Sequence, residues 1–335
     1  MAMRIAPCLL AVAAGCGGDR ASSTPDAADD DAAVRCETAA PWARAPGLAL
    51  GATQETAAVA VDGKIYVIGG FNQGSTLAVV DAVQVFDIAA CAWSMGPALP
   101  KPVHHANAAV VDGTIYVVGS MQSTSFLAIG DTWSWRPATE SGWTVRAPMP
   151  AGTQRGSSIT GAIDGKIYVA GGLRNGASTE VSIYDPVADG WTAGPPLPQP
   201  RDHGCGGAVG GKLYVTGGRN ANIGSTSPIV FELTPGAGWI QRAPMPTARG
   251  GTACGVIGDR IIVAGGEGNP AAGSRGVFPQ VEAYDAVADT WATLAPMPTP
   301  RHGMGAAAWD GRLYVPGGAD QQAFGAVATH EILTP

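Results

Sequence analysis

The sequence predicts an all-β protein assembled from six copies of one structural unit. A turn followed by an apolar run and two glycines, DGKIYVIGG at residues 62–70, recurs as DGTIYVVGS, DGKIYVAGG, GGKLYVTGG, GDRIIVAGG and DGRLYVPGG. The last residues of these phrases are 50, 52, 46, 48 and 52 positions apart. A persistent period near 50 is typical of repeat architectures, and residues 36–335 carry no amphipathic helical pattern.

The composition agrees with a large core built from many short strands. Of the 335 residues, 46% are hydrophobic and only 14% are charged, so the chain can bury a sizeable core. The 48 glycines and 26 prolines indicate frequent turns. The net charge of −7 argues against a nucleic-acid partner, because such partners require a basic surface.

The first 35 residues are predicted to direct export. Residues 1–15 have the pattern of a signal peptide, with Arg4 before an apolar stretch that is too short to be a permanent membrane span. The stretch ends in Ala13-Ala14-Gly15-Cys16, which resembles a bacterial lipobox. The resemblance implies that Cys16 carries palmitate and starts the mature chain, and the alternative is an ordinary secretory signal. Residues 16–35, rich in Asp, Ala and Ser, are predicted to be a lipidated, disordered tether.

Each unit is expected to contain four short antiparallel strands, because apolar residues alternate between turn residues. The first strand has small residues, such as those at 105–111, and the second is the glycine-ended phrase. The third ends in an aromatic residue and an acid: Phe86-Asp87, Tyr184-Asp185, Phe231-Glu232 and Tyr284-Asp285. The fourth carries a tryptophan and leads into Pro-Met-Pro or a variant: Trp93, Trp143, Trp191, Trp239 and Trp291.

The combination of a Gly-Gly doublet, a Tyr-Asp pair, a spaced Trp and Pro-Met-Pro resembles kelch repeats over residues 41–335. This resemblance implies a β-propeller, in which four-stranded blades surround a central channel. The second repeat departs from the pattern, with Ser120 in place of a glycine and Trp133-Ser134-Trp135 in place of the aromatic–acid pair.

The two ends of the chain are predicted to share a blade. The sixth repeat stops after its third strand, while an additional Trp strand at 41–46 precedes the first repeat. Trp42 lies 51 residues before Trp93, in step with the repeat. We therefore expect residues 36–335 to form a six-bladed kelch-type β-propeller whose sixth blade is closed by the N-terminal strand, which removes a free sheet edge.

One aligned position suggests a binding site. Just before the first strand of each unit, the repeats place Thr53, Val103, Arg155, Arg201, Arg249 and Arg301. We call this position the arginine slot. Arginines there would lie near one mouth of the channel and could form a cationic funnel for an anionic or polar ligand. Alternatively, each arginine ties one blade to the next by bonding backbone carbonyls.

Four histidines follow the arginine slot and join the candidate site. His104 and His302 come directly after it, and His105 and His203 come one residue later. A metal-binding or acid–base role competes with a solvated or carbonyl-bonded role. Because the histidines come from three units without a close-spaced ligand motif, we expect no metal or cofactor. The predicted ligand-binding site contains the four arginines of the slot together with His203 and His302. Asp202 beside His203 is expected to raise the pKa of His203.

The cysteines after the tether fall into two groups. Cys36 precedes the closing strand and Cys91 precedes Trp93, which places them in neighbouring blades. A disulfide between them is expected in an oxidising compartment. Cys205 and Cys254 fall on first strands, where small residues are needed, and are expected to remain thiols.

The expected function is that of a monomeric, envelope-anchored recognition module that binds a protein, peptide or glycan at the arginine-bearing face. Secretion or a periplasmic location without the lipid is the alternative. Kelch-type propellers include enzymes, so the resemblance also allows an epimerase-like enzyme acting on an acidic sugar. A structural role in the envelope is the third possibility. No contiguous catalytic motif decides between them.

Overall fold

The computed structural model describes residues 36, 37, 40–74, 76–220 and 222–335. The predicted signal peptide, Cys16 and the tether lie outside these residues. The described part of the chain forms β-strands, turns and isolated bridges and contains no helix, as the sequence predicts. It consequently offers no segment with the length and apolar composition of a helical membrane span.

Most of the described strands belong to sheets of four antiparallel strands, which confirms the predicted unit. From the innermost strand outwards, the first such sheet contains β3 (Ala57–Val61), β4 (Lys64–Ile68), β7 (Val83–Asp87) and β8 (Ala92–Met95). The second contains β9 (Ala108–Val111), β10 (Thr114–Gln122), β11 (Leu127–Trp135) and β12 (Thr144–Arg146). The third contains β13 (Ile159–Ile163), β14 (Lys166–Ala170), β15 (Val181–Asp185) and β16 (Gly190–Ala193).

The next three sheets are β17 (Cys205–Val209), β18 (Lys212–Thr216), β19 (Val230–Thr234) and β20 (Gly238–Arg242); β21 (Ala253–Ile257), β22 (Arg260–Ala264), β23 (Val281–Asp285) and β24 (Thr290–Thr293); and β25 (Ala307–Trp309), β26 (Arg312–Pro316), β27 (His330–Leu333) and β1 (Trp42–Ala45). A small additional sheet contains β2 (Thr53–Gln54), β5 (Phe71–Gln73) and β6 (Leu77–Val79).

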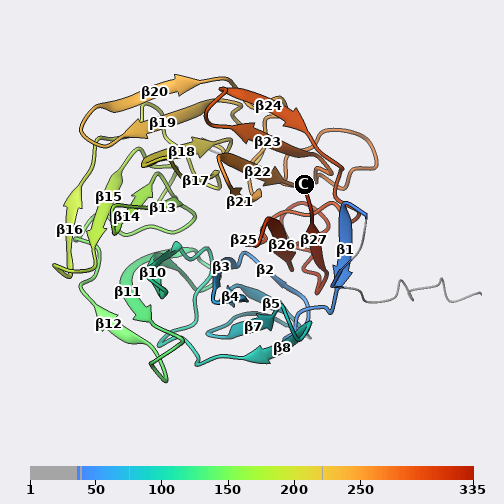
Figure 1. Cartoon of the computed structure of the whole chain (residues 1–335), viewed down its shortest axis with the longest axis horizontal. Helices are drawn as coiled ribbons and strands as arrows, with labels where there is room; N and C mark the ends of the chain where they lie inside the picture. The colour runs from blue at the N-terminus through green and yellow to red at the C-terminus, as the bar shows by residue number, and fades with distance from the viewer. Residues whose placement is uncertain (1–35, 38–39, 75, 221) are drawn as a thin grey trace, which may run out of the picture. The chain divides into compact units, whose positions relative to one another are not determined.

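The four-stranded sheets succeed one another around a common centre (Figure 1). The innermost strand of each sheet contacts that of the next, in the order β3, β9, β13, β17, β21, β25 and back to β3. Strand β1 pairs antiparallel with β27, with Trp42 opposite Leu333 and Ala45 opposite His330. The first strand of the described chain therefore lies in the same sheet as the last.

The second glycine of the repeated phrase connects neighbouring sheets. Gly70 donates its backbone N–H to the carbonyl of Val103, the arginine-slot residue of the next sheet, at 2.8 Å. Its φ is 112°, and a Cβ there would lie 2.6 Å from the Gln54 carbonyl oxygen, so this position requires glycine. The same bond recurs between Gly172 and Arg201, Gly218 and Arg249, Gly266 and Arg301, and Gly318 and Thr53.

The second repeat replaces this bond with a side chain. Ser120 stands where the other repeats have the second glycine. There the side-chain amide of Asn107 donates to the Arg155 carbonyl at 2.9 Å and to the Val118 carbonyl at 3.0 Å. The connection to the next sheet is therefore kept although the glycine is lost.

Each repeated tryptophan also joins two sheets. Its indole N–H donates to a backbone carbonyl at the end of the preceding sheet, at 2.8–3.1 Å. The pairs are Trp42 with Ala295, Trp93 with Pro46, Trp143 with Pro97, Trp191 with Ala147, Trp239 with Pro195, and Trp291 with Ala243. The repeat of 50 residues thus brings one indole to each boundary between sheets.

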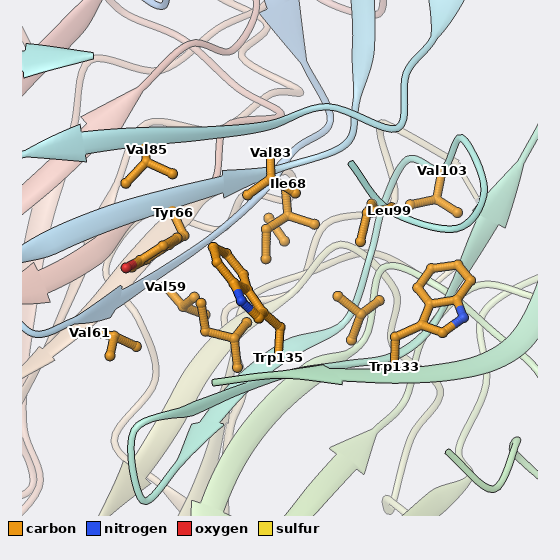
Figure 2. Packing of buried hydrophobic residues seen from close by; sticks show 13 residues of the cluster. Val59, Val61, Tyr66, Ile68, Val83, Val85, Leu99, Val103, Trp133 and Trp135 are labelled. Atoms are coloured by element: carbon orange, nitrogen blue, oxygen red, sulfur yellow. The ribbon is translucent and has the colours of Figure 1, made fainter. Parts of the chain in front are cut away.

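Apolar side chains fill the space between adjacent sheets, and Figure 2 shows the boundary between the first two. The rings of Tyr66 and Trp135 meet edge to face with centroids 5.5 Å apart, and Trp133 is almost fully buried. The departure of the second repeat from the aromatic–acid pattern therefore serves packing, because both tryptophans belong to this core.

The burial of His330 predicts that the free energy of unfolding decreases in acid. It is fully buried against Phe86 and Trp93, and burial, with the charge of Arg301, lowers its pKa to about 3. The unfolded state binds a proton below pH of about 6.5 while the folded state stays neutral, so stability is full above that pH and falls as the pH drops towards 3. The expected contribution lost at pH 5 is about 2 kcal/mol. Urea unfolding at pH 7 and pH 5 measures it, and His330→Leu should show a smaller pH difference. An equal difference in both proteins would contradict this assignment.

Candidate functional site

The four slot arginines lie inside the sheets and not at an open mouth. Arg155, Arg249 and Arg301 are fully buried and Arg201 is 2% exposed. Arg155 donates to the carbonyls of Gly171 at 2.6 Å and Val169 at 2.8 Å, both in its own sheet. Burial lowers the pKa of Arg155 to about 10. This placement fits the scaffold interpretation and not the open funnel, because all four guanidinium groups lie below the surface. Those of Arg155 and Arg249 bond carbonyls of their own sheets, whereas Arg201 Nε and Arg301 Nε and Nη1 have no hydrogen-bond partner. The side-chain bonds of Arg155 therefore connect strands within one blade. The bond between neighbouring blades instead uses the backbone carbonyl of the slot residue, which at five of the six slots accepts from the second glycine of the preceding repeat.

Two residues beyond the arginine slot, the repeats meet at the centre. In each case the backbone N–H donates to the carbonyl of the equivalent residue in the preceding sheet, at 2.5–3.2 Å. The bonds run through Glu55, His105, Ser157, His203, Gly251, Gly303 and back to Glu55. We call these residues the central ring.

The backbone conformation of the central ring is one that favours glycine, yet several of its positions carry larger side chains. All its members have positive φ, between 50° and 64°. Glycine adopts this conformation without strain, but a glutamate or serine there costs on the order of 1–3 kcal/mol. Strained residues of this kind gather at functional sites, so Glu55, His105 and His203 are the first candidates for function.

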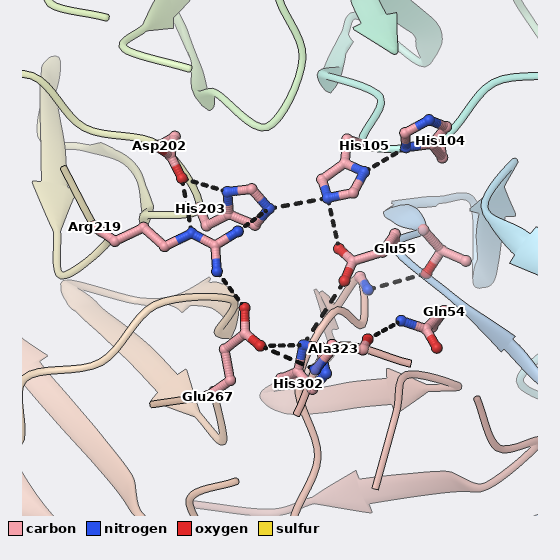
Figure 3. A network of polar contacts seen from close by, with 12 residues as sticks. Gln54, Glu55, His104, His105, Asp202, His203, Arg219, Glu267, His302 and Ala323 are labelled. Carbon is pink, nitrogen blue, oxygen red and sulfur yellow. Dashed lines mark hydrogen bonds and ion pairs between the residues drawn. The ribbon is translucent and has the colours of Figure 1, made fainter. Parts of the chain in front are cut away.

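Charged side chains converge over the central ring (Figure 3). His105 Nε2 lies 3.0 Å from Glu55 Oε2 and 2.9 Å from His203 Nε2. Gly303 makes room for this arrangement, because a Cβ there would lie 2.5 Å from Glu55 Oε1. Four more side chains surround the three and complete what we call the central cluster: Asp202, Arg219, Glu267 and His302.

Arg219 links the members of the central cluster. Its Nε lies 3.0 Å from Asp202 Oδ1, its Nη1 lies 2.5 Å from Glu267 Oε1, and its Nη2 lies 2.9 Å from His203 Nε2. Arg219 and Glu267 each follow a Gly-Gly doublet, in neighbouring repeats. The loops after β18 and β22 therefore deliver opposite charges to the same centre.

The electrostatics of the cluster differ from one sequence expectation. Asp202 Oδ1 does bond His203 Nδ1, at 2.5 Å. Nevertheless burial and the charge of Arg219 lower the pKa of His203, although Asp202 acts in the opposite direction. Asp202 therefore acts in the expected direction, but the net pKa of His203 is lowered and not raised. Burial acts to raise the pKa of Glu55, but the charge of His105 and its hydrogen bond hold that pKa well below the usual value.

Three cavities adjoin or lie near the central cluster. A cavity of about 110 Å³ is lined by Glu55, His105 and His203 and shares Ser158 and Gly204 with a channel of about 440 Å³ along the innermost strands. A separate pocket, also of about 440 Å³, is formed by the loops around Arg219. It is lined by Leu173, Asp202, Arg219, Asn222, Ile223 and Gly224. We call it the Arg219 pocket; it combines a guanidinium group, a carboxylate and apolar walls.

The sequence identified part of this site. His203 and His302 of the predicted set belong to the central cluster, whereas the four slot arginines do not. Glu55, Arg219 and Glu267 were missed. The repeat alignment contained a signal for Glu55, since it occupies the same position as His105 and His203.

The four cysteines of the described residues form two disulfides. Cys36 and Cys91 are bonded, with Cα atoms 5.9 Å apart. Cys205 and Cys254 are also bonded, again with Cα atoms 5.9 Å apart, so the expectation that they remain thiols is wrong. Their strands, β17 and β21, are adjacent innermost strands, and this separation lies within the range that a disulfide can bridge.

Comparison with known proteins identifies the family. Residues 43–218 match the KLHDC2/KLHL20/DRC7 Kelch-repeats domain, and residues 248–298 match the Kelch motif. The chain belongs to the kelch-repeat family. The Kelch-like protein terF of Aspergillus terreus (strain NIH 2624 / FGSC A1156) is 35% identical over 314 residues, which cover 88% of this chain and 66% of terF. This kelch-repeat chain thus spans just under two thirds of the length of that relative.

The fold comparison agrees with this assignment. The solved structure of YjhT superposes with a TM-score of 0.69 at 20% identity, over 85% of this chain and 95% of the other. With the family match, this likeness confirms the kelch-type propeller fold that the repeated Gly-Gly and Trp residues predicted.

Proposed function

We propose that this kelch-repeat protein is a recognition module that binds a polar ligand, a glycan or a peptide, in the Arg219 pocket. The observation that carries the proposal is the chemistry of that pocket. Arg219 and Asp202 supply donors and acceptors, and Leu173 and Ile223 supply apolar walls. Ligand sites typically combine a mostly apolar surface with a few fixed polar groups.

The scaffold of this module is, in our proposal, a six-bladed ring whose last blade is completed by β1. Support comes from the cyclic contacts of the innermost strands, the hydrogen bonds of the central ring and the pairing of β1 with β27. A closed ring would hold the loops of the Arg219 pocket on a rigid base, and recognition commonly uses variable loops on such a base.

Substitution inside the Arg219 pocket tests recognition. Ile223→Glu should weaken binding about tenfold or more, because it places a charge on an apolar wall beside Asp202. Binding is measured on an array of glycans and peptides and by pull-down from bacterial envelope extracts. Val187→Glu is the matched control, since Val187 is 97% exposed in the turn between β15 and β16, at the opposite ends of the strands. Equal binding by wild type and Ile223→Glu would contradict the proposal.

We also propose that the protein is exported and anchored through lipid on Cys16. The support is the resemblance of Ala13-Ala14-Gly15-Cys16 to a lipobox. Radiolabelled palmitate should enter the wild-type protein and not Cys16→Ser, and the variant should leave the membrane fraction. Labelling of both proteins would rule out Cys16 as the acceptor.

An enzyme is the second candidate, favoured by the contact between Asp202 and His203. A carboxylate that holds an imidazole in one tautomer is a common arrangement for a general base, and Glu55 lies close by. An acidic sugar is the substrate class to screen, because the partly exposed positive charge of Arg219 would attract a carboxylate. Turnover that is lost in Asp202→Asn and His203→Gln would favour the enzyme over the pure recognition module.

A further inference from the structure

We propose that Glu55, His105 and His203 bind one divalent first-row transition-metal ion, through Glu55 Oε2, His105 Nε2 and His203 Nε2. One possible ligand atom from each residue lies within 4.8 Å of the other two, and the residues come from three separate repeats. The proposal goes beyond recognition in the Arg219 pocket and does not require a ligand there.

The hydrogen bonds on the His105 side orient a lone pair inwards. His104 Nε2 lies 2.9 Å from the Ser123 carbonyl oxygen, which can only accept, so this nitrogen carries the proton of a neutral imidazole. His104 Nδ1 is then the acceptor for the proton on His105 Nδ1, 2.5 Å away. In the neutral form of His105 that a metal ion requires, the ring has thereby used its single proton, and its Nε2 presents a lone pair to the centre.

The same arrangement follows on the His203 side. Asp202 Oδ1 accepts the proton on His203 Nδ1, which leaves a lone pair on His203 Nε2. With both imidazoles neutral, a carboxylate oxygen of Glu55 and the lone pairs of His105 Nε2 and His203 Nε2 therefore face one another, which positive charge favours. Arg219 Nη2, 2.9 Å from His203 Nε2, supplies part of that charge, and a metal ion between the three ligands would supply it to all of them. Metal-binding histidines commonly have their other ring nitrogen fixed by a carboxylate or a hydrogen-bonded partner. Asp202 and His104 are positioning residues in this sense.

The charge of the central cluster favours a dication. With neutral imidazoles, the carboxylates of Glu55, Asp202 and Glu267 contribute −3 and Arg219 contributes +1, which leaves −2. His302 adds an independent sign of an incomplete site. It is fully buried, and its Nδ1 has no hydrogen-bond partner although it lies 3.7 Å from Glu55 Oε1 and 3.6 Å from Glu267 Oε2.

The ligand set indicates the class of metal. Two imidazole nitrogens and one carboxylate oxygen suit zinc, iron or cobalt, whereas calcium and magnesium prefer all-oxygen sites. Bonds of about 2.0–2.1 Å in tetrahedral geometry place neighbouring ligand atoms about 3.3 Å apart. The observed separations of 2.9 and 3.0 Å from His105 Nε2 need only a small expansion.

Two consequences for the surroundings follow from such an ion. The Arg219 Nη2 contact with His203 Nε2 must give way, but Arg219 keeps Asp202 and Glu267. The remaining coordination positions face the cavity of about 110 Å³ next to the central ring, which has room for water. A site with three protein ligands and an open position is the arrangement of catalytic zinc sites.

Metal titration of the untagged, folded chain tests the proposal. After removal of metals by chelation, the wild type should take up one equivalent of Co²⁺ with a visible absorption band, and Zn²⁺ should displace it. Glu55→Gln and His203→Gln should bind at least about 10–100-fold more weakly and lose the band. Asp202→Asn should weaken binding about 10–100-fold and shift the band, which a merely structural role would not do.

A buried histidine outside the cluster provides the control. His330→Leu should bind Co²⁺ as the wild type does, and near-ultraviolet circular dichroism should show that all variants are folded. Two outcomes overturn the proposal. One is a folded wild type that takes up no Co²⁺ or Zn²⁺, in which case a shared proton fills the centre. The other is binding that is unchanged in both Glu55→Gln and His203→Gln.

Discussion

Arg249→Ala is expected to lower the free energy of unfolding by about 3–5 kcal/mol. The guanidinium is fully buried and donates to the carbonyls of Gly265 at 2.7 Å and Val263 at 3.1 Å. It also pairs at 2.5 Å with Glu282, which is itself almost fully buried. Alanine would leave the buried Glu282 carboxylate without its cation and the two carbonyls without these donors, although Thr247 still donates to Glu282. The penalty of an unpaired buried charge exceeds the ordinary loss of one hydrogen bond.

Two further variants separate geometry from charge. Arg249→Lys keeps the charge but cannot reproduce the fork that reaches two carbonyls and a carboxylate, so an intermediate loss is expected. Arg275→Ala is the exposed control, because Arg275 pairs with Asp320 at the surface, and its loss should cost at most about 1 kcal/mol. Urea unfolding measures all three. An unchanged midpoint in Arg249→Ala together with lost ligand binding would restore the funnel interpretation.

The fold was predictable because each repeated residue has one structural task. The second glycine donates to the next sheet from a positive φ, and the tryptophan N–H reaches the preceding sheet. Neither task tolerates many residue types, so both leave a periodic trace in the sequence. The task of Asn107, which replaces the glycine bond in the second repeat, occurs once and left no such trace.

The site was harder to predict, because residues that recur in every repeat identify the scaffold, whereas the candidate site residues are those that differ from the repeat. Arginine recurs in four of the six slots, and in three of them it bonds backbone carbonyls of its own sheet. Two residues later, glycine suffices at Gly251 and Gly303, and three of the four departures from glycine are the functional candidates Glu55, His105 and His203, the fourth being Ser157. Arg219 and Glu267 were out of reach for a different reason. Only the arrangement of the sheets brings their loops together across 48 residues of sequence.

The double variant Cys36→Ser/Cys91→Ser is expected to lose about 4 kcal/mol of stability. The disulfide closes a loop with a sequence separation of 55 residues, and the chain-entropy relation gives about 4 kcal/mol for a loop of this size. Thermal and urea unfolding of the oxidised proteins measure the loss. Cys205→Ala/Cys254→Ala is the matched control, since its disulfide spans a similar 49 residues but lies between innermost strands.

The position of the first disulfide makes its effect local as well as global. Cys36 precedes β1, and β1 covers the edge of β27 through pairs such as Ala45 with His330. Once the bond is removed, the β1 pairing, the Trp42 indole bond to Ala295 and the bond from the Thr334 N–H to the Pro41 carbonyl remain at this end of the chain, but the covalent link to the turn before Trp93 is lost. Amide hydrogen exchange at residues 330–333 should therefore accelerate more than exchange in β14 or β18, whose neighbours are unaffected. Uniform acceleration in all sheets would instead mean that the disulfide acts only on the unfolded chain and that β1 stays docked without it.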